Sequence, residues 1–203
     1  MRKLWFAFIL LLSTPLSAAE KTLHFDADAA GQLPKDFSAL SGSWKIFAEA
    51  GTPSGGQALA QTAKNERSVF NLVLLNDLKL ADVDVSVKFK SIGGEDDQGG
   101  GVVWRYKDEK NYYVARFNPL ETNFRLYHIL AGKRTQLKEA KLSLGAGWHS
   151  LRVSMAGEAI TCYLDGAKQI EATDGTFKDA GQVGLWTKAD AHTAFDDLSV
   201  SGK

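Results

Sequence analysis

The sequence has very little cysteine: Cys162 is the only one, so no disulfide can form within the chain. It also lacks an excess of charge, because 24 Lys and Arg balance 24 Asp and Glu. A neutral chain has neither the basic footprint of a general nucleic-acid-binding protein nor a polybasic membrane patch. The four histidines show no zinc-ligand spacing, and there is no phosphate-binding loop and no Gly-x-Ser-x-Gly elbow. Stability must therefore come from packing, and the common catalytic motifs are excluded.

Long apolar runs are also absent, apart from one near the N-terminus. Arg2 and Lys3 precede a run of apolar residues at 4–12, and the small residues Ser17-Ala18-Ala19 follow. This order is typical of a secretory signal peptide, and the run is shorter than the roughly 20 residues of a membrane-spanning helix. We therefore predict a cleavable signal peptide at residues 1–19 and an exported protein, periplasmic or secreted, with no membrane span in the mature chain.

Alternation with a period of two dominates the rest of the chain, and no segment shows a sustained helical period. "VDVSVKFKSI" places Val83, Val85, Val87 and Phe89 on one face of a predicted strand. Asp165-Gly166 stands between two further alternating runs, which is a strong β-hairpin signal. Cys162 shares its period with Ile160 and Leu164 and is expected to be a small buried apolar residue. We predict one all-β domain, residues 20–203, built as a sandwich of antiparallel sheets.

The segment 99–119, "GGGVVWRYKDEKNYYVARFNP", reads as a hairpin with its turn at residues 108–111. In this register one face, predicted to be core, holds Trp104, Tyr106, Tyr113, Ala115 and Phe117. The opposite, outer face receives Arg105, Tyr112 and Arg116, and the next strand adds Arg125 and Tyr127. If the strand at 83–90 joins the same sheet, the outer face also gains Asp84 and Lys88.

Arginines and tyrosines on a rigid sheet suit a sugar ligand, since guanidinium groups donate hydrogen bonds in a fixed fork. We therefore predict a carbohydrate-binding surface. The alternative is a solvated face with cross-strand ion pairs. The predicted ligand-binding residues are Arg105, Arg116, Arg125, Tyr112, Tyr127 and Lys88.

Three stretches resemble a known family: "GGGVVWRYKDEKNYYVARFNPLETNFRLY", "GWHSLRVSMAGEAITCYLDGAKQIEATDGTF" and "GQVGLWTKADAHTAFDDLSV". They resemble the concanavalin A-like lectin/glucanase fold and, more narrowly, bacterial exported domains described as 3-keto-disaccharide hydrolase-like. These domains are related to laminin G-like modules. The resemblance implies a jelly-roll sandwich of two curved sheets whose concave sheet carries a carbohydrate site.

Two other functions stay open at this point. The resemblance implies a hydrolase or lyase, but the Glu-x-Asp-x-x-Glu arrangement of glycosidases with this fold is absent. The acid–base candidates for an enzyme are Asp84, Glu121 and His128. The third possibility is a laminin G-like domain that recognises a protein of the cell envelope.

A structural calcium ion is a further expectation, because carboxylates occur near both ends of the predicted domain. Calcium prefers six to eight oxygen ligands, including carboxylates. The candidate ligands are Asp26, Asp28, Asp196 and Asp197. The alternative is that Asp196 accepts hydrogen bonds from backbone amides of a neighbouring loop. We expect the mature protein to be a monomer.

Overall fold

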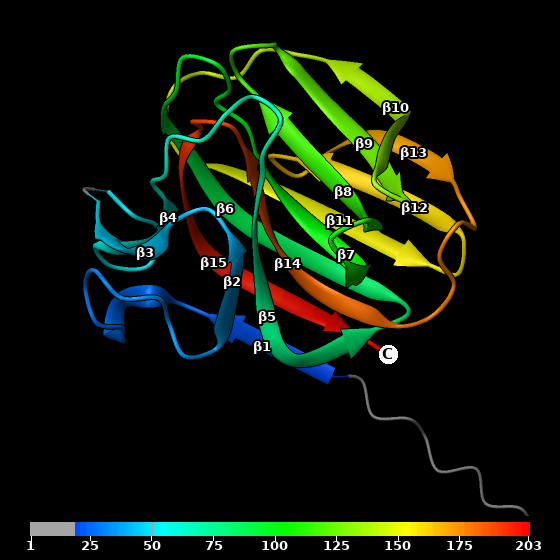
Figure 1. The fold of residues 1–203 in the computed structure, drawn as a ribbon, viewed down its shortest axis with the longest axis horizontal. Coiled ribbons are helices and arrows are strands. Elements are labelled where there is room, and N and C mark those ends of the chain that lie inside the picture. Colours follow the sequence, from blue (N-terminus) through cyan, green and yellow to red (C-terminus); the bar gives the residue numbers. More distant parts are fainter. Residues whose placement is uncertain (1–18, 50) are drawn as a thin grey trace, which may run out of the picture.

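The computed structural model describes residues 19–49 and 51–203, which form two antiparallel β-sheets packed against each other (Figure 1). The eight-stranded sheet has the order β13–β12–β11–β6–β15–β4–β3, and β1 joins it by pairing with β15. The seven-stranded sheet has the order β10–β9–β8–β7–β14–β5–β2. The one helical element in the described residues is the 3-10 turn η1 (Phe25–Ala27). The predicted all-β sandwich is confirmed.

The strands of the two sheets have the following bounds. The eight-stranded sheet consists of β1 (Ala19–Leu23), β3 (Trp44–Ala48), β4 (Gln57–Gln61), β6 (Val83–Gly93), β11 (His149–Ala156), β12 (Ala159–Leu164), β13 (Ala167–Thr173) and β15 (His192–Gly202). The seven-stranded sheet consists of β2 (Phe37–Ser41), β5 (Phe70–Leu80), β7 (Gly100–Asp108), β8 (Asn111–Asn118), β9 (Asn123–Leu130), β10 (Lys133–Lys141) and β14 (Gly181–Lys188).

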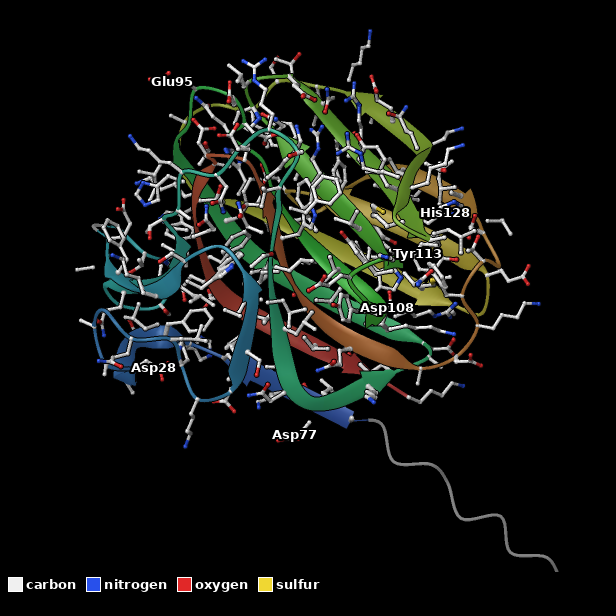
Figure 2. All side chains as sticks on the ribbon, viewed as in Figure 1. Asp28, Asp77, Glu95, Asp108, Tyr113 and His128 are labelled. Atoms are coloured by element: carbon white, nitrogen blue, oxygen red, sulfur yellow. The ribbon has the colours of Figure 1, made fainter. Side chains whose placement is uncertain are left out.

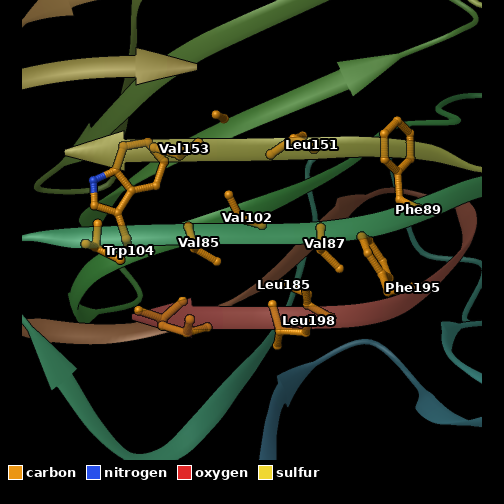
Figure 3. Close-up of a cluster of buried hydrophobic side chains, with 14 of the residues drawn as sticks. Val85, Val87, Phe89, Val102, Trp104, Leu151, Val153, Leu185, Phe195 and Leu198 are labelled. Atoms are coloured by element: carbon orange, nitrogen blue, oxygen red, sulfur yellow. The ribbon is translucent and has the colours of Figure 1, made fainter. Parts of the chain in front are cut away.

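The main hydrophobic core lies between the two sheets (Figure 3). Strand β6 points Val85, Val87 and Phe89 into this core, as the period-two pattern predicted. Trp104 of β7 and Leu185 of β14 approach them from the other sheet. Each fully buried side chain of this size stabilises the fold by roughly 1.5–3 kcal/mol. Neither sheet can bury its apolar face without the other.

Cys162 of β12 also lies in this core and is fully buried. Burial raises the pKa of its thiol to about 12, because an apolar environment disfavours the thiolate. The prediction of a small buried apolar residue is confirmed.

The hairpin of β7 and β8 turns where the sequence predicted, but its register changes along the strands. Asp108 pairs with Asn111 across a two-residue turn. A β-bulge between Trp104 and Asp108 then shifts the pairing by two residues, so that Trp104 lies opposite Tyr113 rather than Ala115. Trp104 and Tyr113 still point into the core as predicted, whereas Tyr106 belongs to a cluster on the other face.

Arg105 lies within this bulge and has a positive φ of 46°. The prediction that it faces outward beside Arg116 is therefore wrong. Its side chain is 1% exposed and donates hydrogen bonds to the backbone oxygens of Ala81 (2.6 Å), Gly157 (2.7 Å) and Phe177. These three acceptors lie in connecting segments, so Arg105 holds one end of the sandwich together.

The predicted signal peptide, residues 1–19, lies outside the described residues except for Ala19, which begins β1. Export stays a prediction that N-terminal sequencing of the mature protein tests. No helix in the described part of the chain is long and apolar enough to cross a membrane.

We expect Arg105→Ala to lower the free energy of unfolding by about 3 kcal/mol, because it removes a buried side chain that donates to three backbone carbonyl groups, one of which, that of Phe177, is buried. Urea denaturation followed by tryptophan fluorescence measures this loss. Arg152→Ala is the matched control, since Arg152 pairs with Asp84 on the solvent side of the other sheet and its loss should cost about 1 kcal/mol or less. Equal losses in the two variants would contradict the anchoring role of Arg105.

Candidate functional site

The outer face of the seven-stranded sheet carries a second cluster of buried apolar side chains. Alternation along each strand points them away from the main core. None of them is more than 6% exposed, although a flat sheet would leave this face open to water. The cluster consists of Leu72, Leu74, Val103, Tyr106, Tyr112, Val114, Tyr127, Ile129 and Trp186, with Phe70 packed against it.

The sheet covers this cluster by bending over it. The guanidinium of Arg134 on β10 lies 5.3 Å from the ring centroid of Phe70 on β5. These strands are first and sixth in the sheet order, and in a flat sheet they would be about 24 Å apart. Figure 1 shows the bent courses of β5 and β14. The sheet is therefore strongly curved, and we call this outer side the concave face.

Two glycines allow the close approach of strands in the middle of the concave face. Gly101 pairs with Trp186 on one side and with Arg116 on the other. A Cβ atom on Gly101 would lie 2.3 Å from the backbone oxygen of Ala115, and one on Gly184 would lie 2.2 Å from that of Val73. Any larger residue at either position would force the strands apart.

Aromatic rings fill the middle of the concave face. Phe70 contacts Trp186 with ring centroids 5.4 Å apart, and Arg134 lies 4.7 Å from the centroid of Tyr127. Burial raises the pKa of Tyr112, an effect that the nearby Trp186 N–H partly offsets. Neither the Tyr112 hydroxyl nor the Trp186 N–H has a well-formed hydrogen bond within the described residues. Burial likewise raises the pKa of Tyr106 to about 12.

A network of charged groups forms one end of the concave face. Arg116, which is 2% exposed, donates to Glu121 Oε2 (2.7 Å) and to Asn123 Oδ1 (2.6 Å). Arg125 donates to the same Glu121 oxygen (3.0 Å) and to Glu139 Oε2 (2.6 Å). Partial burial acts to raise the pKa of Glu121, but Arg116, Asn123 and Arg125 together lower it. The two guanidinium groups therefore share the Glu121 carboxylate, and Glu139 supplies the second negative charge.

Asp97 lies next to this network and is 1% exposed. Its Oδ1 accepts hydrogen bonds from the backbone N–H of Gly99 (2.7 Å) and from Asn118 Nδ2 (3.1 Å). Its Oδ2 has no hydrogen-bond partner among the described residues, and Lys188 Nζ lies 3.9 Å away. Burial raises the pKa of Asp97 despite these donors and the nearby Arg116.

The structure brings together part of the predicted ligand-binding set. Arg116 and Arg125 pair across β8 and β9, Tyr112 and Tyr127 lie on the same face, and the turn between these strands supplies Glu121. The prediction that strand 83–90 extends this face is wrong, because β6 lies in the other sheet between β11 and β15. Lys88 and Asp84 are therefore not part of the concave face.

The three acid–base candidates do not form one site. Asp84 pairs with Arg152 on the eight-stranded sheet, whereas Glu121 belongs to the concave face. His128 pairs in register with Tyr113, near which it appears in Figure 2, and its Nδ1 lies 3.4 Å from Asp174 Oδ2. These groups cannot act together on one substrate atom.

The predicted calcium ligands do not converge either. The described residues contain no group of three or more His, Cys, Asp or Glu that could hold a metal ion. Asp196 instead accepts hydrogen bonds from the backbone N–H (3.0 Å) and hydroxyl (2.8 Å) of Ser54, and Asp197 contacts His24. Asp26 accepts from the Gln57 backbone N–H, and Asp28 lies at the periphery in Figure 2. The four carboxylates therefore do not come together within the described residues, and the calcium ion stays an expectation.

Sequence reasoning missed several residues of the concave face. Phe70, Arg134, Glu139 and Trp186 come from strands whose places in the sheet were not predicted, and Asp97 comes from a glycine-rich loop. Leu185 and Trp186 are adjacent in β14 and so point to opposite faces, but their sequence positions carry no information about which other strands share the face of Trp186.

No protein-family model and no curated protein matches the sequence. Solved structures do match the fold. The carbohydrate-binding module CBM66 from Bacillus subtilis is 21% identical, with a TM-score of 0.66 over 81% of this chain and 94% of that one. The GH43 protein BlXynB (K247S mutant) from Bacillus licheniformis is 17% identical, with a TM-score of 0.65 over 90% of this chain and only 39% of the other.

The transglycosylase Crh5, in its apo form, is 13% identical, with a TM-score of 0.62 over 90% of this chain and 84% of that one. The structural neighbours are concanavalin A-like β-sandwiches, and this chain has that fold. At these identities the likeness describes the fold alone.

We expect Glu121→Gln to lower the free energy of unfolding by about 1 kcal/mol at pH 7, because it removes the charge that Arg116 and Arg125 share and because Glu121 is partly screened by water. The folded state lowers the pKa of Glu121, so this contribution is complete above the unfolded-state value of 4.5 and disappears as the pH falls through the folded-state value. Urea denaturation from pH 7 to pH 3 measures the difference.

The control for this change is Glu171→Gln, since Glu171 pairs with Lys168 at a highly exposed position and should contribute little. A difference between wild type and Glu121→Gln that does not shrink at low pH would contradict the assignment.

Proposed function

We propose that the concave face binds a carbohydrate. The observation that carries this proposal is the joining of aromatic rings and an arginine–glutamate network within one curved surface. Sugars present C–H groups on the faces of their rings and hydroxyl groups at the edges, so a binding surface needs both apolar and hydrogen-bonding groups. The concave face offers the two kinds of group side by side.

The exposed and half-exposed residues of the concave face have distinct roles in this proposal. The half-buried ring of Phe70 supplies an apolar surface for a sugar ring. Arg125 and Glu121 supply donors and an acceptor at the network end, and the exposed Gln136 lies opposite Tyr127 in the register of β10 and β9. Because the bent sheet fixes all of these positions, little ordering is needed when a ligand binds.

The comparisons support the proposal at the level of fold. One structural neighbour is named as a carbohydrate-binding module and another as a transglycosylase. The sequence resemblance to concanavalin A-like lectins points to the same curved sheet. Fold alone does not fix function, so the proposal depends on the residues of the concave face.

We expect Phe70→Ala to weaken the binding of a soluble glycan about five- to tenfold, which corresponds to the loss of roughly 1 kcal/mol of apolar contact. A glycan array identifies the ligand, and isothermal titration calorimetry then measures the dissociation constant. Phe47→Ala is the matched control, since Phe47 is a half-buried ring on β3 of the other sheet. If no glycan on a broad array binds, the proposed function is wrong.

Hydrolysis of a glycosidic bond on the same face is the second candidate. Asp97 and Glu121 are linked through Asn118, which donates to Asp97 and accepts from the Glu121 backbone N–H (3.4 Å). Their pKa values move in opposite directions, upward for Asp97 and downward for Glu121. Such a contrast is typical of a general acid and its partner carboxylate. The resemblance to 3-keto-disaccharide hydrolase-like domains agrees with this candidate.

Incubation with 3-keto-disaccharides and with their unoxidised counterparts tests this candidate by release of monosaccharide. An active protein should lose at least a hundredfold in rate in Asp97→Asn, since acid–base groups typically contribute about 10²–10⁴. If the protein bound glycans but hydrolysed none of these substrates, the proposed binding function would stand and the hydrolase candidate would be wrong.

A further inference from the structure

One arginine on the concave face differs from every other arginine in the described residues. Five of the six donate to carboxylates or to backbone oxygens, whereas Arg134 makes neither a hydrogen bond nor an ion pair in this part of the chain. The five with partners are Arg67, Arg105, Arg116, Arg125 and Arg152. Arg134 is exposed and extends from the edge strand β10 to the rings of Tyr127 and Phe70 on the concave face.

Aromatic contacts, rather than hydrogen bonds, hold Arg134 in place. Its guanidinium carbon lies 4.7 Å from the ring centroid of Tyr127 and 5.3 Å from that of Phe70. Contacts with aromatic rings stabilise a guanidinium but leave its N–H donors unused. The donors of Arg134 therefore have no protein acceptor in the described residues, and the side chain is already positioned. An oxyanion that accepts two parallel hydrogen bonds is the ligand group that suits a fork of this kind.

The charges around Arg134 favour an anion as well. Strand β10, "KRTQLKEAK", carries four cations and one anion, and the anion, Glu139, is already paired with Arg125. Lys133, Lys138 and Lys141 are exposed and form no ion pair within the described residues. The positive charge of β10 is local, since the whole chain is neutral. At the network end, by contrast, Glu121 and Glu139 together already balance the charges of Arg116 and Arg125.

We propose that the carbohydrate bound on the concave face is acidic, and that a uronate carboxylate of the ligand pairs with the guanidinium of Arg134. This inference rests on the proposed function and adds the chemical class of the ligand. The sugar ring lies against Phe70, and its carboxylate occupies the in-plane side of the guanidinium. The lysines of β10 attract the polyanion over a longer range, which makes the association sensitive to salt.

The test is a set of matched oligosaccharides titrated by calorimetry against the purified protein. The acidic members are oligomers of galacturonate, glucuronate, mannuronate and guluronate, and each has its methyl ester as the neutral counterpart. Dextran sulfate and dextran form a separate pair that tests a sulfate in place of a carboxylate. At least one uronate should bind about tenfold more tightly than its ester at low salt, with a smaller ratio at high salt.

Arg134→Gln should abolish the preference, so that the acid and its ester bind with equal affinity, because the charged pair is lost. Arg134→Lys should keep part of the preference, since it retains the charge but not the fork. Arg152→Gln is the matched control: Arg152 also lies over a tyrosine ring, 5.0 Å from that of Tyr163, but on the other sheet. The control should bind like the wild type.

Three outcomes would overturn the inference. Equal affinity for acids and esters would show that the ligand need not be acidic, although the face would still bind carbohydrate. Binding of dextran sulfate without binding of any uronate would show that the carboxylate is the wrong anion. If Arg134→Gln still preferred the acid, residues other than Arg134 would be responsible for that preference. Failure of every saccharide, acidic or neutral, would instead contradict the proposed function itself.

Discussion

The bending of the seven-stranded sheet is the constraint on which the rest of the structure depends. It brings Arg134 on β10 into contact with Phe70 on β5, although four strands lie between them. The bend hides nine apolar side chains that would otherwise face water, so it closes a second hydrophobic cluster outside the main core. Gly101 and Gly184 make the bend possible, because a side chain at either position would meet the neighbouring backbone.

Alternation of apolar residues was enough to predict the sandwich and part of its core. Val85, Val87 and Phe89 point inward because every second residue of a half-buried strand must leave water. Arg105 and Tyr106 escaped prediction because one bulge exchanges the faces of a strand without changing its composition. Nothing in the sequence predicts a positive φ at an arginine. The pair Asp165-Gly166, by contrast, is typical of a hairpin turn, and the turn is found there.

The candidate site was predicted only where its residues are neighbours along the chain. Arg116, Arg125 and Tyr127 belong to consecutive strands joined by a short turn, so local register was sufficient to place them together. Phe70 and Trp186 reach the same face from β5 and β14, whose neighbours in the sheet depend on long connections. The aspartates near the two ends were grouped by their sequence positions, but Asp196 accepts hydrogen bonds from Ser54 and Asp197 contacts His24, so the described residues do not bring all four together.

The buried thiol of Cys162 has a practical consequence. It is the only cysteine of the chain, it has no exposed surface, and its high pKa keeps it in the unreactive thiol form. An alkylating reagent can modify it only after β12 separates from its neighbours, so the rate of labelling reports how often the eight-stranded sheet opens. Labelling at this single site would therefore measure the opening of the eight-stranded sheet, which is not the sheet that carries the concave face.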